Sequence, residues 1–326
     1  MNIEKRLDFR DHILICNWNE KIPFLMDDLN SDSNTQKRAC IIITDNVTSF
    51  PENITDNDNK KDPFQDTAII PGKPCDTVAL TRAGAEDAHT IIIIPDFRHP
   101  DPDNYSLQIA LTIKDFVDEK IYRKKEKRIK EYYQKTFKNM NDKEKEELFN
   151  KLSDKEKMEI THRPRVLVKV VDSNNATHFD SYTITGINEV VCEKELGLRA
   201  LALSSINHHS ASVFNEIMTY DSNGSELYSV FIPETWYKGK TENEKSITSF
   251  PQICKKTYEV NGNTGVIVVG YIRMENEKAN VLINPPAIRL KENKIKHHEK
   301  GDRLLVLAPN MDIAATLFTK NKSDVD

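Results

Sequence analysis

Five residues stand directly after short apolar runs, at the positions where an alternating strand–helix sequence forms a nucleotide site: Asn17, Trp18, Asn19, Asp45 and Asp96. Open parallel sheets bind ligands at the carboxyl ends of their strands, and an acid after the second strand accepts hydrogen bonds from a ribose. We therefore expect a bound nucleotide, either NAD or an adenine nucleotide, to lie against these five residues. Asp45 follows the second run, so we expect it at the ribose.

The turn after the first run lacks the glycines that let a backbone approach a pyrophosphate. Asn17 and Asn19 stand there instead. Asparagine tolerates a left-handed φ better than other non-glycine residues, but it adds a side chain where a phosphate would approach. The turn fits a nucleotide-binding fold, and it does not by itself indicate NAD binding.

A second kind of chemistry is suggested by the acids Asp96, Asp101 and Asp103, which are close in sequence. Hard cations need several carboxylate or carbonyl oxygens, so these residues are candidate ligands for a divalent cation. An acidic loop in contact with solvent explains the same pattern more simply. We assign no metal site, and the identity of any cation stays open.

Catalysis is not predicted. A hydride-transfer enzyme needs a group that relays a proton to its substrate. Histidines such as His89 and His208 have no neighbouring Ser, Asp or Lys in an arrangement that could surround a substrate. We therefore predict that the chain is not an enzyme, and we keep an NAD(P)-dependent oxidoreductase as the alternative, because a fold alone does not exclude one.

Composition narrows the class of protein. The formal net charge of −5 offers no basic field for nucleic acid. The five cysteines are odd in number and widely spaced, without a Cys-x-x-Cys pair, which is typical of reduced thiols in a cytoplasm. No apolar run is long enough to cross a bilayer. We expect a cytoplasmic protein with no nucleic-acid partner.

The elements that must position the candidate site alternate along residues 11–192. The apolar runs predict strands at 12–16, 39–44, 67–70, 90–94 and 165–171, and residues 185–192 predict a turn followed by a sixth strand. Helical spacing predicts helices at 21–30, 77–83 and 105–117, with Asp76 as a cap and Gly84 as a terminator. This alternation predicts an α/β domain with a Rossmann-like, mostly parallel sheet covered by helices on both faces.

Residues 120–160 differ in composition from the rest of this domain, being dense in Lys and Glu. Asn141 with Glu144, and Ser153 with Glu156, have the spacing of capping boxes. The segment is therefore predicted to be an inserted, peripheral helical element. A solvated helical excursion is favoured over a binding role, because acids interrupt its basic cluster.

The last third of the chain predicts a change of architecture. Residues 195–207 form a helix with apolar residues over a wide arc, and 213–218 continue it after a break, so we expect 193–220 to be a crossover unit that packs on another subunit. Strand-like runs then dominate residues 227–310, which predicts a separate small α+β lobe.

Several segments together resemble the RCK domains, the regulators of potassium conductance, whose two lobes are also known as TrkA-N and TrkA-C. The similar segments are residues 12–20, 72–74, 80–94, 185–191, 195–202, 265–270, 283–286 and 301–307. Their order and spacing follow the family over nearly all of the chain apart from 46–66 and 120–160.

The resemblance implies a cytosolic ligand-sensing module of a potassium channel or transporter, at the inner face of the cell membrane. In this family, lobes pair through their crossover helices, and the pairs assemble into an octameric gating ring that pulls on the pore. The implied partners are further copies of the chain and a membrane-spanning pore or transporter subunit. The chain is then either a freestanding subunit or part of a channel.

The sequence departs from the family at its ligand sites. Nucleotide-binding relatives have glycines where Asn17 and Asn19 stand, and the family's Gly-Asp after the third strand is Gly72-Lys73 here. The fifth strand ends in Lys169, Val170 and Val171 instead of the acids of calcium-gated relatives. A calcium site is therefore not implied, and a structural subunit without a ligand stays open beside a ligand sensor.

Overall fold

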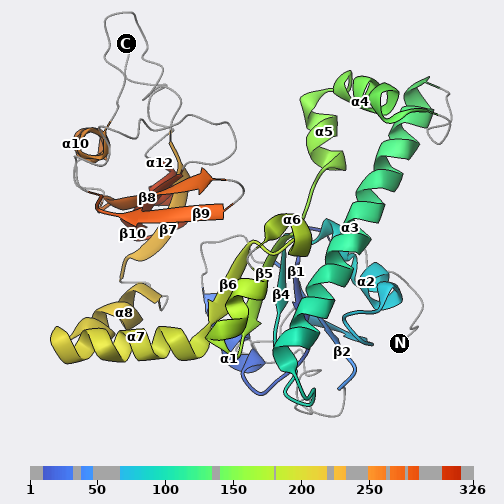
Figure 1. Cartoon of the computed structure of the whole chain (residues 1–326). Coiled ribbons are helices and arrows are strands. Elements are labelled where there is room, and N and C mark those ends of the chain that lie inside the picture. Colours follow the sequence, from blue (N-terminus) through green and yellow to red (C-terminus); the bar gives the residue numbers. More distant parts are fainter. Residues whose placement is uncertain are drawn as a thin grey trace, which may run out of the picture. The chain divides into compact units, whose positions relative to one another are not determined.

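The computed structural model describes residues 10–31, 38–46, 67–133, 140–179, 181–218, 224–232, 249–261, 265–275, 278–285 and 303–316. Contacts divide the chain into two compact units, one with Met1–Asp27 and Arg38–Gly197 and the other with Asp28–Lys37 and Leu198–Asp326 (Figure 1). The finer division into 11–192, 193–220 and 227–310 stays a prediction. The predicted loop at 46–66 lies almost wholly outside the described residues.

The first unit is built on a six-stranded sheet in the order β3-β2-β1-β4-β5-β6, and every neighbouring pair is parallel. The strands are β1 (Ile13–Cys16), β2 (Cys40–Thr44), β3 (Thr67–Pro71), β4 (Thr90–Ile93), β5 (Arg165–Val170) and β6 (Glu189–Cys192). Leu14, Ile41 and Ile91 in the central strands are fully buried. The predicted fold class is confirmed.

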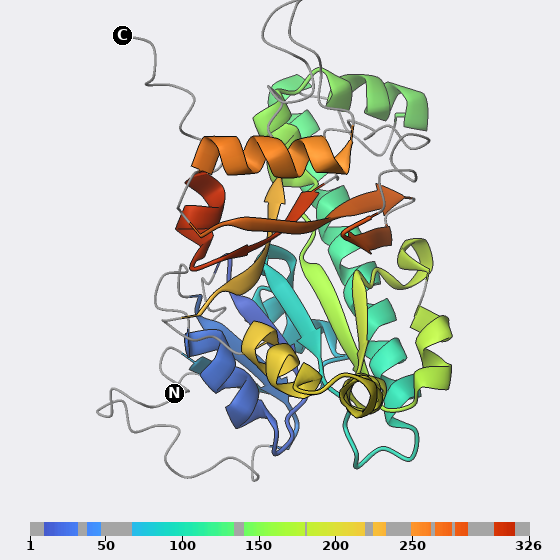
Figure 2. The same ribbon diagram turned by 90° about the vertical axis from the view of Figure 1, so that its left-hand side faces the viewer.

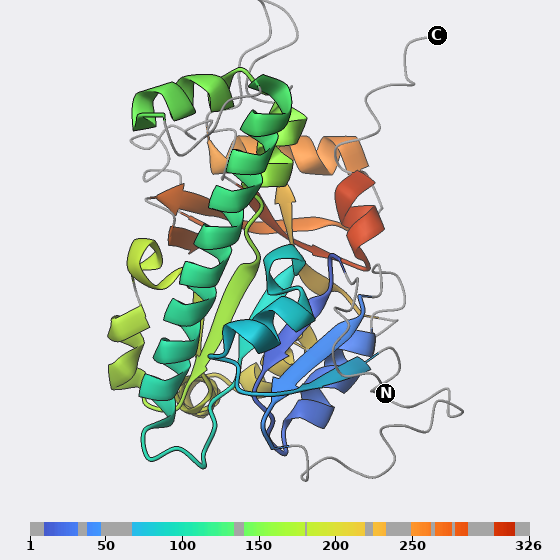
Figure 3. The same ribbon diagram turned by 90° about the vertical axis from the view of Figure 1, so that its right-hand side faces the viewer.

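Helices cover both faces of this sheet. Figures 2 and 3 show α1 (Ile22–Ser31) on one face, and α2 (Thr77–Ala83) beside α3 (Pro102–Tyr133) on the other. Asp76 accepts a hydrogen bond from the backbone of Val78, and Gly84 ends α2 with a φ of 62°. Both predicted helix boundaries are therefore confirmed, and the short η3 (Ala85–Asp87) leads into β4.

Helix α3 is longer than the sequence predicts. We expected it to end near Val117, where the composition changes, but it continues to Tyr133. Ion pairs one turn apart join Lys114 to Asp118 at 2.8 Å and Glu126 to Lys130 at 3.0 Å, and such pairs stabilise exposed helix. The charged composition therefore extends the helix beyond the sheet.

Helices α4 (Asp142–Asn150) and α5 (Asp154–Ile160) follow at the C-terminal end of α3, as Figures 1 and 3 show. Both predicted capping boxes are present. Phe149, Leu152 and Ile160 form a small hydrophobic cluster, and the ammonium group of Lys125 lies 4.3 Å from the centre of the Phe149 ring. We call residues 120–160 the arm.

After β5 the chain forms η5 (Ser173–Phe179) and α6 (Tyr182–Thr185) and then returns to the sheet as β6. Helix α7 (Glu193–Ile206) follows β6 directly and is followed by α8 (Ser210–Met218). The division between the two units falls within α7, after Gly197. No helix in the described part of the chain is both long and apolar enough to span a membrane.

The second unit contains an antiparallel sheet in the order β7-β10-β8-β9. Its strands are β7 (Glu226–Phe231), β8 (Ile267–Glu275), β9 (Lys278–Ile283) and β10 (Arg303–Ala308). Figure 2 shows α10 (Phe250–Asn261) lying along this sheet, and α12 (Met311–Thr316) follows β10. The sequence analysis did not identify α10, whose buried residues Phe250 and Ile253 join the core of this unit.

Candidate functional site

The five predicted site residues lie at the carboxyl edge of the parallel sheet. The order β2-β1-β4 places the ends of β2 and β4 on either side of the end of β1, and the direction of the connections reverses between β1 and β4. Ligands of open α/β sheets bind at such a reversal. Asp45 follows β2 and Asp96 follows β4, so the fold brings together residues that are far apart in sequence. The assignment of these residues to a ligand stays a prediction.

Asn17 is used within the fold itself. Its φ is 75°, in the left-handed region, and its side chain is almost fully buried. The Nδ2 group donates a hydrogen bond to the carbonyl oxygen of Ile94 at 2.8 Å. Asn17 therefore ties the end of β1 to the end of β4, where a glycine would leave the crevice open.

The next two residues of the turn are also engaged. Trp18 is buried with 6% of its surface exposed. The Oδ1 atom of Asn19 accepts a hydrogen bond from the backbone of Lys21 at 2.9 Å, and its carbonyl oxygen accepts one from Ile22 at 3.1 Å. A free helix N-terminus attracts phosphate through such backbone groups. At α1, Asn19 already satisfies two of them.

Arg98 completes this edge of the sheet, and the sequence analysis did not single it out. Its Nη2 group lies 2.5 Å from Oδ1 of Asp45 and 2.6 Å from Oδ2 of Asp96, and its Nε donates to Oδ1 of Asp96 at 2.9 Å. Its backbone N–H donates to the same Oδ1 at 3.0 Å, which closes a turn typical of Asp. The spacing of Asp96 and Arg98 was the available signal, but Asp45 is not near them in sequence.

These contacts set the charge of the edge. Burial by itself raises the pKa of Asp96, but the hydrogen bonds from the side chain and backbone of Arg98 outweigh it and lower the pKa below its usual value. The bonds from Asp96 and Asp45 raise the pKa of Arg98 above its already high value. Asp96 and Arg98 are therefore charged at neutral pH, and the pairing is internal to the chain.

A pair of aromatic rings lies beside Asp96. The His99 ring stacks on Tyr105 with a centroid distance of 3.9 Å and an interplanar angle of 11°. Tyr105 is buried, and its hydroxyl lies 3.9 Å from the Sγ atom of Cys75. Burial and the neighbouring Cys75 raise the pKa of Tyr105 above its usual value. The phenol is therefore neutral, and it is not poised to act as a base.

The acids at the start of α3 have structural roles. Asp103 is 3% exposed and accepts hydrogen bonds from the backbone of Val171 at 2.7 Å and of Asp172 at 3.0 Å, and from Nδ2 of Asn175 at 2.9 Å. Asp101 accepts one from the backbone of Asn104 at 3.0 Å. Among the residues that the structure describes, no three His, Cys, Asp or Glu side chains are placed to hold a metal ion.

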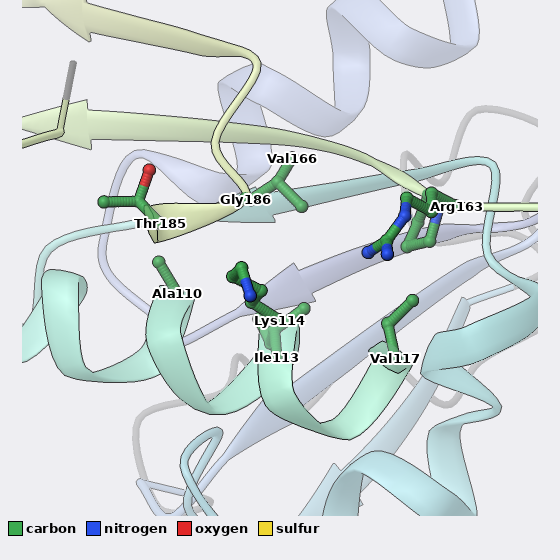
Figure 4. Close-up of a pocket in the computed structure, with 9 residues that line it drawn as sticks. Ala110, Ile113, Lys114, Val117, Arg163, Val166, Thr185 and Gly186 are labelled. Carbon is green, nitrogen blue, oxygen red and sulfur yellow. The ribbon is translucent and has the colours of Figure 1, made fainter. Parts of the chain in front are cut away.

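Figure 4 shows a small cavity between α3 and the segments that flank β5. Its volume of about 20 Å³ is enough for roughly one water molecule. Gly186 approaches α3 so closely that an added Cβ would lie 3.2 Å from the Cβ of Lys114, and its φ of 71° also favours glycine. This cavity is a packing feature of α3 and not a ligand site.

A separate surface is formed by α7 and α8. Helix α7 has no buried side chain, and both helices carry large apolar side chains that are at least 43% exposed. These are Leu196, Leu198, Leu201, Leu203, Ile206, Val213, Phe214 and Met218. We call this set the crossover surface. Contiguous exposed apolar surface marks an interaction site in soluble proteins.

The first unit is similar to a family of known proteins. Residues 8–158 match the family model described as the RCK domain of slowpoke-like calcium-activated potassium channels. The match covers slightly less than half of the chain and includes β1 to β4 and α3. The resemblance to RCK domains is therefore confirmed. No curated protein matches the chain.

Solved structures extend the comparison to the whole chain. The human SLO3 gating ring is 12% identical, covers 96% of this chain and 47% of the solved chain, and has a TM-score of 0.54. The chain therefore spans about half the length of that protein, and at this identity the likeness shows the fold alone.

Two further structures are more distant. The TrkA-N domain of the inner membrane protein ybaL from Escherichia coli is 10% identical, over 60% of this chain and 97% of that one, with a TM-score of 0.37. GsuK bound to ADP is 14% identical, over 75% of this chain and 49% of that one, with a TM-score of 0.35. Neither likeness is close enough to assign a ligand to this chain.

Proposed function

We propose that the chain is a non-enzymatic regulatory module of a potassium channel or transporter and that it acts as an assembly of identical copies at the cytosolic face of a membrane. The RCK match over 8–158 supports the regulatory class. The observation that carries the assembly is the crossover surface, because a soluble monomer rarely leaves so many large apolar side chains exposed on two consecutive helices.

The geometry of assembly follows from symmetry. In a two-fold dimer the same patch meets itself, so α7 and α8 of one copy face α7 and α8 of the next. Further stacking of such dimers into an octameric ring follows the family pattern. A ring coupled to a pore would transmit a change at the carboxyl edge through β6, which leads directly into α7.

Sedimentation of the purified chain tests this proposal. We expect the wild type to dimerise at micromolar concentration and Leu203→Glu to be monomeric, because the variant places a charge in an apolar seam. Met158→Glu is the matched control, since Met158 is 75% exposed and belongs to α5, not to the residues that make up the crossover surface. A wild-type chain that stays monomeric at all concentrations would overturn the proposal, as would equal association of the two variants.

A ligand-free structural subunit is the second candidate. It is favoured by the turn after β1, where Asn17 and Asn19 use the groups that a dinucleotide would need. Isothermal titration with NAD, ADP, ATP and calcium separates it from a ligand sensor. An oxidoreductase has less support, because the neutral Tyr105 at this edge is paired with Cys75 and is buried.

A further inference from the structure

The arm has a net charge opposite in sign to that of the rest of the chain. Residues 120–160 contain fourteen Lys and Arg and nine Asp and Glu, a net charge of +5, whereas the whole chain has −5. The remaining residues therefore have a net charge of −10. Within the arm the cations gather in the second half of α3, where residues 123–130 contain six Lys and Arg and one Glu. Charge separated in this way marks the arm as a surface for an anionic partner.

Three of these cations lie on one face of α3, in the part of the helix that Figure 3 shows continuing beyond the sheet. Arg123, Lys127 and Lys130 are four and three positions apart, a spacing that aligns side chains along a helix. Their side chains are 67%, 80% and 49% exposed. Ile129 in the same stretch is fully buried, so this part of α3 has one covered face and one cationic face. We call the three cations the basic stripe.

The acids that interrupt the basic cluster in the sequence are not equally presented in the folded helix. Glu126 is only 15% exposed, and its carboxylate lies 3.0 Å from Nζ of Lys130. Glu131 is more exposed, but it lies 4.0 Å from Nζ of Lys127. Exposed ion pairs within one helix contribute little to stability. The stripe can therefore exchange these carboxylates for another anion at little cost.

A hollow beside the stripe is a less suitable place for an anion. It lies between α3, α5 and η3 and has a volume of about 730 Å³. Four Lys or Arg and four Asp or Glu side chains line it, so it has no excess of positive charge. Two of its cations already link the arm to other elements, since Lys124 lies 3.0 Å from Asp87 and Arg128 lies 3.3 Å from Glu156.

The composition of the stripe favours a lipid surface over a protein. The buried centres of protein interfaces are depleted of Lys and Glu, and their binding energy comes from aromatic and Arg anchors in shaped pockets. The stripe instead offers long, exposed cations with acids between them. An anionic bilayer attracts each Lys or Arg near it through its surface potential, without requiring a complementary shape. The cytosolic leaflet carries such anionic lipids.

We propose that the basic stripe binds the anionic lipid surface of the membrane and so holds the module against the bilayer. The ammonium and guanidinium groups of the stripe exchange their exposed carboxylates for the phosphates and carboxylates of lipid headgroups. The same helix buries Ile113 and Phe116 against the parallel sheet, so a continuous helix connects the lipid contact to the core of the first unit. The inference rests on the proposed function, which places the chain at the cytosolic face of a membrane.

Co-sedimentation of the full chain with vesicles tests the proposal. We expect the wild type to bind phosphatidylcholine vesicles only when part of the lipid is phosphatidylserine, and to bind less as salt is added, because salt screens exposed charges. Changing the stripe by Arg123→Gln, Lys127→Gln and Lys130→Gln together should weaken binding about a hundredfold, about fivefold for each cation. Glutamine has nearly the helix propensity of the residues that it replaces.

The matched control removes the same charge from another part of the arm. Lys143→Gln, Lys151→Gln and Lys155→Gln together change three exposed cations in or next to α4 and α5. We expect this variant to lose no more than about fivefold in binding. Circular dichroism checks that both variants are folded. If the stripe variant is misfolded, Lys127→Gln alone carries the test, with a loss of about fivefold.

Three results would overturn the proposal. One is equal binding of the wild type to vesicles with and without phosphatidylserine. Another is an equal loss in the two triple variants, which would mean that net charge decides and not the stripe. The third is no vesicle binding together with stripe-dependent binding of polyglutamate, which would assign the surface to an acidic protein.

Failure of this inference is distinguishable from failure of the proposed assembly. Sedimentation without vesicles reports on assembly alone, and Leu203→Glu keeps the basic stripe intact. A wild type that dimerises but does not bind anionic vesicles would overturn the lipid contact only. A wild type that binds these vesicles through the stripe but stays monomeric in solution would overturn the assembly only.

Discussion

Helices α3 and α7 are both rich in apolar residues, but the fold uses them in opposite ways. The first half of α3 lies on the parallel sheet and buries Ile109, Ala110, Ile113, Phe116 and Val117 to 4% exposure or less. Helix α7 buries none of its side chains. Leu198 and Leu201 in α7 are 67% and 69% exposed. The comparison shows that apolar content does not determine burial. Contact with a sheet determines it.

The two helices are also anchored differently at their N-terminal ends. Asp103 in the first turn of α3 is buried and joins it to the end of β5 through two backbone N–H groups and Asn175. Glu193 in the first turn of α7 pairs with Lys21 and Lys169, but its side chain is 52% exposed. The start of α3 is therefore held by the hydrogen bonds of a buried carboxylate. Helix α7 begins with an exposed ion pair, and none of its side chains is buried.

The largest expected effect comes from shortening one apolar side chain in each helix. Ile113→Ala should lower the free energy of unfolding by about 2–5 kcal/mol, because it enlarges the small cavity beside α3. Leu196→Ala, in the part of α7 that belongs to the first unit, should change it by less than about 0.5 kcal/mol and should instead weaken self-association. Urea denaturation of monomer, followed by Trp18 fluorescence in a Trp236→Phe background, measures the first unit alone. Equal destabilisation by the two variants would break the comparison.

A smaller effect is expected from the anchor of α3. Asp103→Ala should cost about 1–3 kcal/mol, since it leaves the part-buried backbone N–H groups of Val171 and Asp172 without their acceptor. Asp101→Ala is the matched control, because Asp101 is exposed and its loss removes a helix cap worth about 1 kcal/mol. The same fluorescence-detected denaturation ranks the two variants. If Asp101→Ala were the more harmful, the role assigned to Asp103 would be wrong.

The smallest effect concerns the anchor of α7 and depends on pH. Hydrogen bonds from Lys169 and then Lys21 lower the pKa of Glu193 from 4.5 to about 2. A lowered folded-state pKa stabilises the protein above the unfolded value, and this stabilisation is lost as the pH falls from about 4.5 to 2. Glu193 is half exposed, so we expect a difference below about 1 kcal/mol between wild type and Glu193→Gln. Denaturation at stepwise lower pH checks the sign, and a difference that grows on acidification would contradict it.

Local chemistry made much of the fold predictable. The cap at Asp76, the glycine at Gly84 and the capping boxes that begin at Asn141 and Ser153 each depend on residues within a few positions of one another. The apolar runs of the parallel strands were equally clear, because strands buried on both faces need no alternation. These features are encoded by neighbouring residues and do not depend on the rest of the molecule.

Three features were not predictable in this way. Arg98 pairs with Asp45, which is 53 positions away. Helix α3 was expected to end at Val117, but Ile129 is fully buried in the arm and the helix continues. Helix α10 begins with Ser249 and Gln252 in capping-box spacing, which the sequence analysis overlooked, but its place depends on packing against the second sheet. In each case a distant partner decides the outcome.

The sequence by itself therefore determined the strand–helix alternation, the resemblance to RCK domains and the position of the acids at strand ends. Only the tertiary structure decided which groups those acids bind. The fold places the guanidinium group of Arg98 against Asp45, and the backbone N–H groups of Val171 and Asp172 against Asp103. These partners are distant in sequence. The structure likewise decided which apolar helix is buried. The apolar pattern of a helix predicts that one of its faces is buried. Only the sheet order and the connections show which element packs against that face.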